Sequence, residues 1–181
     1  MSVTVLILPG YGDSGPDHWQ TLWERRHGYA RVVQDDWERP DVEAWKERLG
    51  EAIAAAPGRV VLVAHSLGCA LVAHAARNEA SARVAGALLV APPDVDEIRH
   101  LLPEIESFSP MPLEPLPFRS LVVGSTDDPY ADPARVRAFA EAWGARFVDV
   151  GAAGHVNADS ALGEWDAGHR LLAELLAAIG C

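Results

Sequence analysis

Short runs of consecutive apolar residues recur along the chain. A parallel strand that is covered on both faces has no polar side, so it is short, continuously apolar and often β-branched. Four runs have this pattern: Val3–Leu8, Val60–Ala64, Val84–Ala91 and Leu121–Gly124. Two weaker runs predict further strands: Ala30–Gln34 and Arg146–Val150. We therefore expect about six strands, most of them parallel.

Between these runs, apolar residues recur three and four positions apart, which is typical of helices packed on one face. In the first such stretch Trp19, Leu22 and Trp23 form an apolar stripe. The predicted helices are Asp17–Arg26, Val42–Ala56, Leu67–Asn78, Pro133–Trp143 and Gly163–Ile179. Alternating strands and helices predict an α/β fold in which helices cover both faces of a parallel sheet.

The segment Pro103–Phe118 departs from this alternation. It contains five prolines, at positions 103, 110, 112, 115 and 117. Proline lacks an N–H donor and disrupts regular helices and central strands, so this segment is expected to be an extended loop. It either borders a substrate pocket or simply connects two elements.

Length and composition narrow the class of protein. A chain of 181 residues, 49% hydrophobic and 23% charged, predicts a single globular domain over residues 1–181. The net charge of −11 argues against nucleic acid or an anionic membrane as a partner. The apolar run at the start lacks the basic flank of a signal peptide and the length of a membrane span, which favours the cytoplasm.

The two cysteines do not form a disulfide framework. Cys69 is predicted to be a small buried helix residue, and Cys181 a free thiol at the terminus. No cysteine, histidine or carboxylate spacing suggests a metal site, and no glycine-rich phosphate loop follows a strand. We therefore expect no metal and no cofactor.

The strand ending at Ala64 leads directly into Ser66, which has small residues two positions away on either side. This pattern is typical of a nucleophile elbow, in which a sharp strand-to-helix turn exposes a serine hydroxyl at the edge of the sheet. The usual sequence is G-x-S-x-G, and here Ala64 replaces the first glycine while Gly68 keeps the second. A serine that merely caps the following helix is the alternative interpretation.

Other candidate catalytic groups follow later strands. In a doubly wound sheet the functional groups gather at the carboxyl ends of the strands. Asp127 and Asp128 follow the strand at Leu121, and His155 follows the last strand. A serine, an aspartate and a histidine in this chain order match the α/β-hydrolases, although Asp94 would preserve the same order. Neighbouring residues of an extended segment point to opposite sides, so only one of Asp127 and Asp128 is expected to face His155.

Six short motifs, spread over nearly the whole chain, carry a resemblance to a known family. They are Pro9–Gly12, Asp17–Trp19, Gln34–Trp37, His65–Gly68, Ala91–Pro93 and Ser125–Tyr130. In these motifs the chain resembles the retinoblastoma-binding-protein-9-like serine hydrolases and their bacterial YdeN-type relatives. The resemblance implies a compact α/β-hydrolase fold without a large cap domain.

The resemblance also implies roles for particular residues. Ser66 matches the nucleophile, His155 the general base and Asp128 the acid of a Ser-Asp-His triad. Oxyanion-hole donors in this fold are the N–H after the nucleophile and one from the loop after the first strand. We expect these to be the N–H groups of Leu67 and Tyr11. Possible pocket-lining residues are His18 and Trp19, whereas His65 is expected to point away from Ser66.

Two functions remain open from the sequence. The first is a cofactor-free serine hydrolase with an open, shallow site that acts on a small ester, thioester or amide. The second is an interaction protein on a hydrolase scaffold, in which the active site is slow or vestigial. The chain lacks a Leu-x-Cys-x-Glu pocket-protein motif, because Leu67–Leu71 fails at its last position. Complete triad residue types favour the enzyme.

Overall fold

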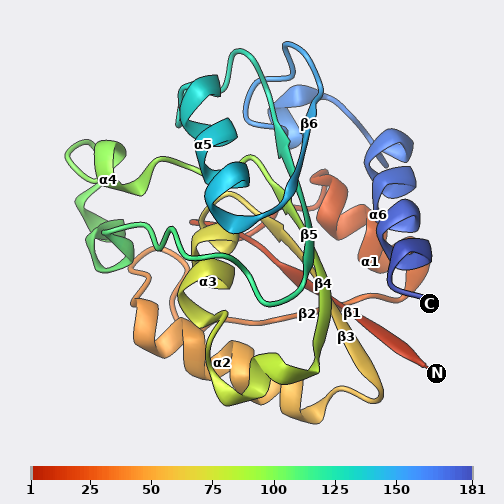
Figure 1. The fold of residues 1–181 in the computed structure, drawn as a ribbon. Coiled ribbons are helices and arrows are strands. Elements are labelled where there is room, and N and C mark those ends of the chain that lie inside the picture. The colour runs from red at the N-terminus through yellow and green to blue at the C-terminus, as the bar shows by residue number, and fades with distance from the viewer. Residues whose placement is uncertain (1, 181) are drawn as a thin grey trace.

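The computed structural model describes residues 2–180, so Cys181 lies outside it. Its six strands form one sheet in the order β2-β1-β3-β4-β5-β6, and every neighbouring pair is parallel (Figure 1). The strands are β1 Val3–Leu8, β2 Ala30–Arg31, β3 Arg59–His65, β4 Val84–Val90, β5 Arg119–Gly124 and β6 Arg146–Asp149. The predicted parallel sheet is confirmed.

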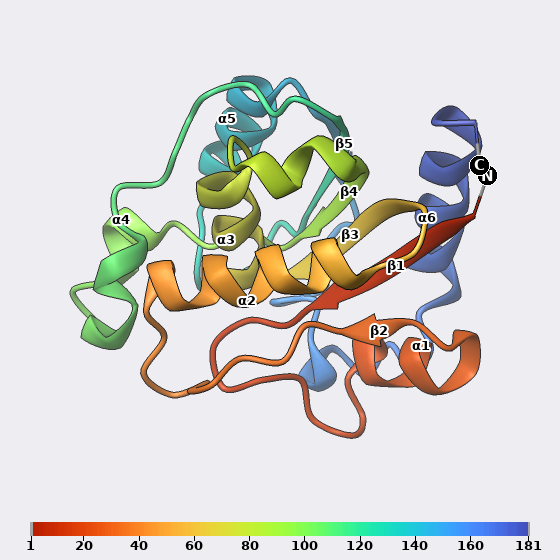
Figure 2. The ribbon, with the colours of Figure 1, turned by 90° about the horizontal axis from the view of Figure 1, so that it is seen from below.

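Helices cover both faces of this sheet. The longer ones are α1 Trp19–His27, α2 Val42–Ala55, α3 Leu67–Ala75, α5 Pro133–Trp143 and α6 Asp166–Ala178. Helices α1 and α6 lie on one side, and α2, α3 and α5 lie on the other (Figures 1 and 2). No helix within residues 2–180 is both long and apolar enough to cross a membrane.

The strands contribute alternate side chains to two cores. In β1, Val5 and Ile7 pack with α1 and α6, whereas Leu6 and Leu8 pack with α2, α3 and α5. Successive side chains of a strand point to opposite faces, so burial of both faces requires apolar residues at every position. This is the physical reason why the strands could be recognised as continuous apolar runs.

The strand order reverses between β1 and β3. From β1 the chain moves outward to β2, and from β3 it continues in the other direction to β4, β5 and β6. Ligands of open parallel sheets bind in the crevice beyond the carboxyl ends of the strands at such a reversal. The segments that follow β1 and β3, Pro9–Gly15 and Ser66–Gly68, meet at this place.

The prediction of an extended loop over Pro103–Phe118 was wrong for its first part. Residues Pro103–Phe108 form a 3₁₀-helix, η2, in which Ile105 and Phe108 are buried. Proline is compatible with the first positions of a helix, where an N–H has no partner inside the helix. A short helix that the sequence did not predict, α4 Val95–Ile98, precedes it in the connection between β4 and β5.

Other boundaries moved by a few residues. The helix predicted over Leu67–Asn78 ends at Ala75, and a separate 3₁₀-helix, η1, spans Glu79–Arg83. The first helix begins at Trp19 because His18 acts as its N-cap. The strand predicted over Ala30–Gln34 is reduced to Ala30–Arg31. A third 3₁₀-helix, η3 Ala158–Ser160, lies before α6.

Gly68 allows α3 to approach the end of β1. A Cβ atom at this position would lie 2.4 Å from the Leu8 carbonyl oxygen and 2.9 Å from that of Pro9. Backbone atoms cannot move aside as easily as a flexible side chain, so an added methyl group would push α3 away from the sheet.

Gly68→Ala is therefore expected to destabilise the protein by about 1–3 kcal/mol, the usual range for overpacking. Gly50→Ala in α2 is the matched control, because a Cβ there meets no atom within 4 Å. The control should stabilise the protein by up to about 1 kcal/mol through helix propensity. Urea denaturation of both variants measures the two free energies of unfolding. Equal effects of the two substitutions would contradict this account of α3 packing.

Candidate active site

The turn between β3 and α3 holds Ser66 in a strained conformation. Its φ of 54° and ψ of −125° are unusual for a residue with a side chain, at a cost of order 1–3 kcal/mol. The turn is fixed by hydrogen bonds from Ser66 N–H to the Val90 carbonyl (2.9 Å) and from Cys69 N–H to the Ser66 carbonyl (2.8 Å). Ala64 is fully buried in the core beneath α3, so its methyl group is accommodated.

Three side chains from three strand ends form one hydrogen-bonded chain. Ser66 Oγ lies 2.8 Å from His155 Nε2, and both carboxylate oxygens of Asp128 lie 2.9 Å from His155 Nδ1. An ionised carboxylate can only accept, so Nδ1 carries the hydrogen and Nε2 is left to accept from the serine hydroxyl. His155 and Asp128 are both buried. Such an arrangement can remove a proton from a hydroxyl and turn it into a nucleophile.

Asp127 faces away from this chain. Its Oδ1 accepts hydrogen bonds from Ser125 Oγ (2.8 Å) and from Gly154 N–H (2.7 Å). These two bonds hold the pKa of the Asp127 carboxyl below its ordinary value. The carboxylate thereby ties the end of β5 to the residue that precedes His155.

Asp94, the third candidate acid, is engaged elsewhere. Its Oδ2 forms an ion pair with Arg135 Nε at 2.9 Å, and Arg135 also contacts Asp96. Of the three aspartates considered from the sequence, only Asp128 contacts His155.

His65 supports His155 from below. It is buried, and its Nε2 lies 2.9 Å from the His155 carbonyl oxygen, to which it must donate because a carbonyl only accepts. Burial lowers the pKa of His65 well below its ordinary value, so the ring is neutral at neutral pH. Within residues 2–180 the ring makes no hydrogen bond to Ser66, and its bond to the carbonyl holds the backbone of His155.

The loop after β1 packs directly on the elbow. A Cβ at Gly10 would lie 2.8 Å from Ser66 Cβ and 3.0 Å from the Leu67 nitrogen, so only glycine permits this approach. The loop is anchored by the hydrogen bond from Gly12 N–H to the Trp37 carbonyl (2.9 Å). Within residues 2–180, the N–H groups of Tyr11 and Leu67 make no hydrogen bond.

Above Ser66 lies a cavity of about 470 Å³. His18 lines it and also caps α1, since its Nδ1 accepts a hydrogen bond from Gln20 N–H (3.1 Å). The prediction that Trp19 lines the pocket was wrong. Trp19 is buried beneath it, and its indole N–H donates to the Val156 carbonyl at 2.8 Å.

Sequence reasoning missed the apolar part of this cavity. The residues concerned come from the connection between β4 and β5: Pro93, Ile98, Leu101, Leu102 and Ile105. In the sequence, only the position of the proline-rich segment Pro103–Phe118 pointed to this part of the cavity. This segment does border the pocket, through Ile105.

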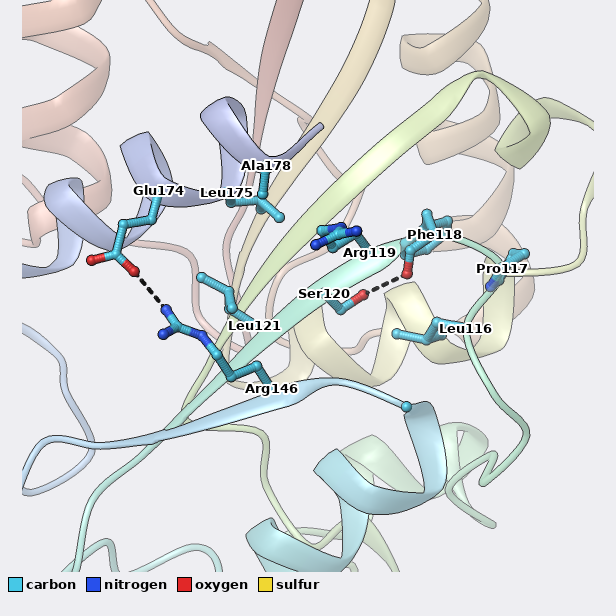
Figure 3. A pocket seen from close by; sticks show the side chains of 11 residues that line it. Leu116, Pro117, Phe118, Arg119, Ser120, Leu121, Arg146, Glu174, Leu175 and Ala178 are labelled. Carbon is cyan, nitrogen blue, oxygen red and sulfur yellow. Dashed lines mark hydrogen bonds and ion pairs between the residues drawn. The ribbon is translucent and has the colours of Figure 1, made fainter. Parts of the chain in front are cut away.

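A second cavity, of about 730 Å³, lies at the opposite edge of the sheet, where β5 and β6 begin (Figure 3). Its polar side chains are largely engaged: Arg146 pairs with Glu174 (2.7 Å), and Ser120 Oγ donates to the Phe118 carbonyl (3.1 Å). No histidine, cysteine or aspartate is among the residues that line it. Its carboxylate, that of Glu174, is paired with Arg146 and makes no hydrogen bond to Ser120.

The chain matches the serine hydrolase family over residues 5–174 and belongs to that family. A YdeN-like hydrolase from Pectobacterium atrosepticum is 31% identical, with a TM-score of 0.87 over 98% of this chain and 92% of its own. The ydeN gene product of B. subtilis is 18% identical and shares the fold, with a TM-score of 0.76. The match covers 97% of this chain and 100% of the ydeN product. Among curated proteins none matches the chain in sequence. The protein is a serine hydrolase with an α/β-hydrolase fold.

The lowered pKa of Asp127 gives a prediction for stability against pH. A carboxyl whose pKa is lower in the folded than in the unfolded protein stabilises the fold above the unfolded value, near 3.8. This contribution is lost as the pH falls through the folded pKa. Asp127→Asn should therefore be less stable than the wild type at pH 7, and the difference should shrink below about pH 4.

Urea denaturation from pH 7 to pH 3 measures this difference. Asp17→Asn is the control, because the exposed Asp17 makes no hydrogen bond or ion pair with the other described residues. A difference between wild type and Asp127→Asn that stays constant over this range would contradict the assignment of the carboxylate to the loop of His155.

Proposed function

We propose that the protein hydrolyses a small ester, thioester or amide through an acyl-enzyme formed on Ser66. The observation that carries the proposal is the hydrogen-bonded chain from Ser66 through His155 to Asp128 at the reversal of strand order. In this reaction His155 is the general base, and Asp128 fixes its tautomer and stabilises the imidazolium that forms.

The first half of the reaction forms the acyl-enzyme. Ser66 Oγ attacks the substrate carbonyl carbon while His155 Nε2 takes the hydroxyl proton. The carbonyl oxygen becomes an oxyanion, which accepts hydrogen bonds from the N–H groups of Leu67 and Tyr11. His155 then gives its proton to the leaving alcohol, thiol or amine. Asp128 remains ionised throughout.

The second half restores the enzyme. His155 takes a proton from water, whose oxygen attacks the acyl carbon on Ser66 through a second oxyanion. The carboxylic acid leaves when His155 returns the proton to Ser66 Oγ. Chains of the same fold include esterase 2 of Thermogutta terrifontis and the type II thioesterase BorB, so this fold is used for both kinds of acyl transfer.

An interaction protein on the same scaffold is the alternative. No described feature favours it over hydrolysis, because a vestigial site has no need of the Ser66–His155–Asp128 geometry. The closer relation to the retinoblastoma-binding-protein-9-like proteins and the location in the cytoplasm stay predictions from the sequence.

A fluorophosphonate probe, which reacts with activated serines, tests the proposed triad. Wild type should be labelled, and Ser66→Ala and His155→Ala should not. Asp128→Asn should lower kcat for p-nitrophenyl butyrate by about 10⁴, the usual cost of a wrong histidine tautomer. Asp127→Asn is the matched control and should keep most of the activity. Equal labelling of wild type and Ser66→Ala would overturn the proposal.

Gly10→Ala tests the oxyanion hole. The added methyl group must displace the loop that carries the Tyr11 N–H, because it would lie 2.8 Å from Ser66 Cβ. Loss of one oxyanion donor lowers kcat by about 10²–10³. Gly50→Ala in α2, away from the cavity, introduces a Cβ that meets no atom within 4 Å and should have little effect on activity. Circular dichroism checks that both variants fold, and equal activities would exclude this role for the loop.

A further inference from the structure

The cavity above Ser66 has two chemically different walls. The segment after β4 supplies an apolar wall, which includes Ile98, Leu101 and Ile105. The segment between β1 and α1 supplies a more polar wall, with Asp13 and His18 beside Tyr11. Since β3 lies between β1 and β4 in the sheet, Ser66 at its end lies between the two walls.

His18, one of the residues that line this cavity, carries a buried hydrogen-bond donor. Its Nδ1 accepts from the Gln20 N–H, which can only donate, so the hydrogen of the neutral ring must be on Nε2. Burial, together with the nearby charges of Arg31 and His155, lowers the pKa of His18 to about 4, so the ring is neutral at neutral pH.

The Nε2–H of His18 lacks a partner. The residue is 5% exposed, and within residues 2–180 this nitrogen has no hydrogen-bond acceptor. Buried polar groups are nearly always paired, so an unpaired donor beside a cavity calls for a partner from outside the chain. An acceptor atom on a ligand in the cavity would complete the hydrogen bonding of this ring.

The opposite wall exposes apolar surface. Leu101 is 87% exposed, and Tyr130, which packs on the His155 ring, is 43% exposed. Five large apolar side chains of the described residues are exposed, and three of them, Tyr11, Leu101 and Tyr130, line this cavity. Apolar surface gathered at a concave site favours an apolar ligand group, because binding removes both surfaces from water.

We propose that the substrate is an amphipathic ester or thioester. Its apolar group lies against Ile98, Leu101 and Ile105, and on the other side of the scissile bond an ether, carbonyl or hydroxyl oxygen accepts a hydrogen bond from His18 Nε2–H. This inference rests on the proposed function, because it needs the scissile carbonyl at Ser66. His18 is then a specificity-determining residue.

Two pairs of nearly isosteric substrates test the role of His18. In one pair the acyl part differs by an ether oxygen: p-nitrophenyl methoxyacetate and p-nitrophenyl butyrate. In the other pair the alcohol part differs in the same way: 2-methoxyethyl hexanoate and butyl hexanoate. The ratio of kcat/KM within each pair is measured for wild type and His18→Asn. Asparagine is a good N-cap, so the variant can keep the cap of α1, and its shorter side chain places no donor at the position of the imidazole Nε2.

In one of the two pairs, His18→Asn is expected to reduce the relative preference for the ether about two- to tenfold, the effect of one neutral hydrogen bond. That pair identifies the part of the substrate that His18 binds. A purely structural role would lower both members of a pair equally, and unchanged ratios in both pairs would overturn the proposal. His27→Asn, at the other end of α1, is the control. His18→Ser, which is also a good N-cap, replaces the first variant if that fails to fold.

The apolar wall is tested separately with Leu101→Ser, which does not endanger folding because the side chain is exposed. The ratio of KM for p-nitrophenyl hexanoate to KM for p-nitrophenyl acetate should rise severalfold in this variant. Leu113→Ser, at an exposed leucine that does not line the cavity, should leave the ratio unchanged. If the ratio of the two KM values is the same in Leu101→Ser and Leu113→Ser, the apolar wall does not bind the substrate. Fluorophosphonate labelling of the wild type distinguishes a failure of this inference from a failure of the proposed function.

Discussion

The close contact of two backbone segments at the reversal of strand order determines how the active site is built. The loop after β1 touches the elbow at Gly10, and α3 touches the end of β1 at Gly68, so neither position has room for a Cβ. This packing, together with the hydrogen bond from Ser66 N–H to Val90, holds the serine at a φ of 54°. A strained residue persists only where its surroundings over-determine it. The rest of the site is arranged around the hydroxyl that this turn exposes.

The histidine reaches that hydroxyl from a loop that follows the edge strand β6. His155 follows β6, two strands beyond β4, and three contacts fix its position. Asp128 holds the ring, His65 holds the carbonyl, and Asp127 holds the preceding Gly154 through its N–H. Two adjacent aspartates thus have different tasks, one toward the imidazole and one toward the loop. Catalytic geometry of this kind depends on supporting contacts as well as on the reacting groups.

The sequence predicted what short-range patterns determine. Strands buried on both faces had to be continuously apolar, so β1, β3, β4 and β5 were recognised. The edge strand β2 was predicted too long, because Val33 is apolar in sequence but exposed in the fold. Ser66 could be identified because an elbow restricts its neighbours in sequence. The acid could not be chosen by spacing, because the direction of two adjacent side chains depends on Ser125 and Gly154, far apart in the chain. The apolar wall and the unpaired nitrogen of His18 arise only from tertiary packing, and nothing local encodes them.

In the proposed mechanism Asp128, and not Asp127, holds the histidine that accepts the proton of Ser66. Proton NMR tests it most directly, because a hydrogen shared between an imidazole nitrogen and a buried carboxylate gives a resonance far downfield of the amide region. We expect this resonance in the wild type and in Asp127→Asn, and its loss in Asp128→Asn and His155→Ala. A downfield resonance that persists in Asp128→Asn, or disappears in Asp127→Asn while the protein stays folded, would contradict the account.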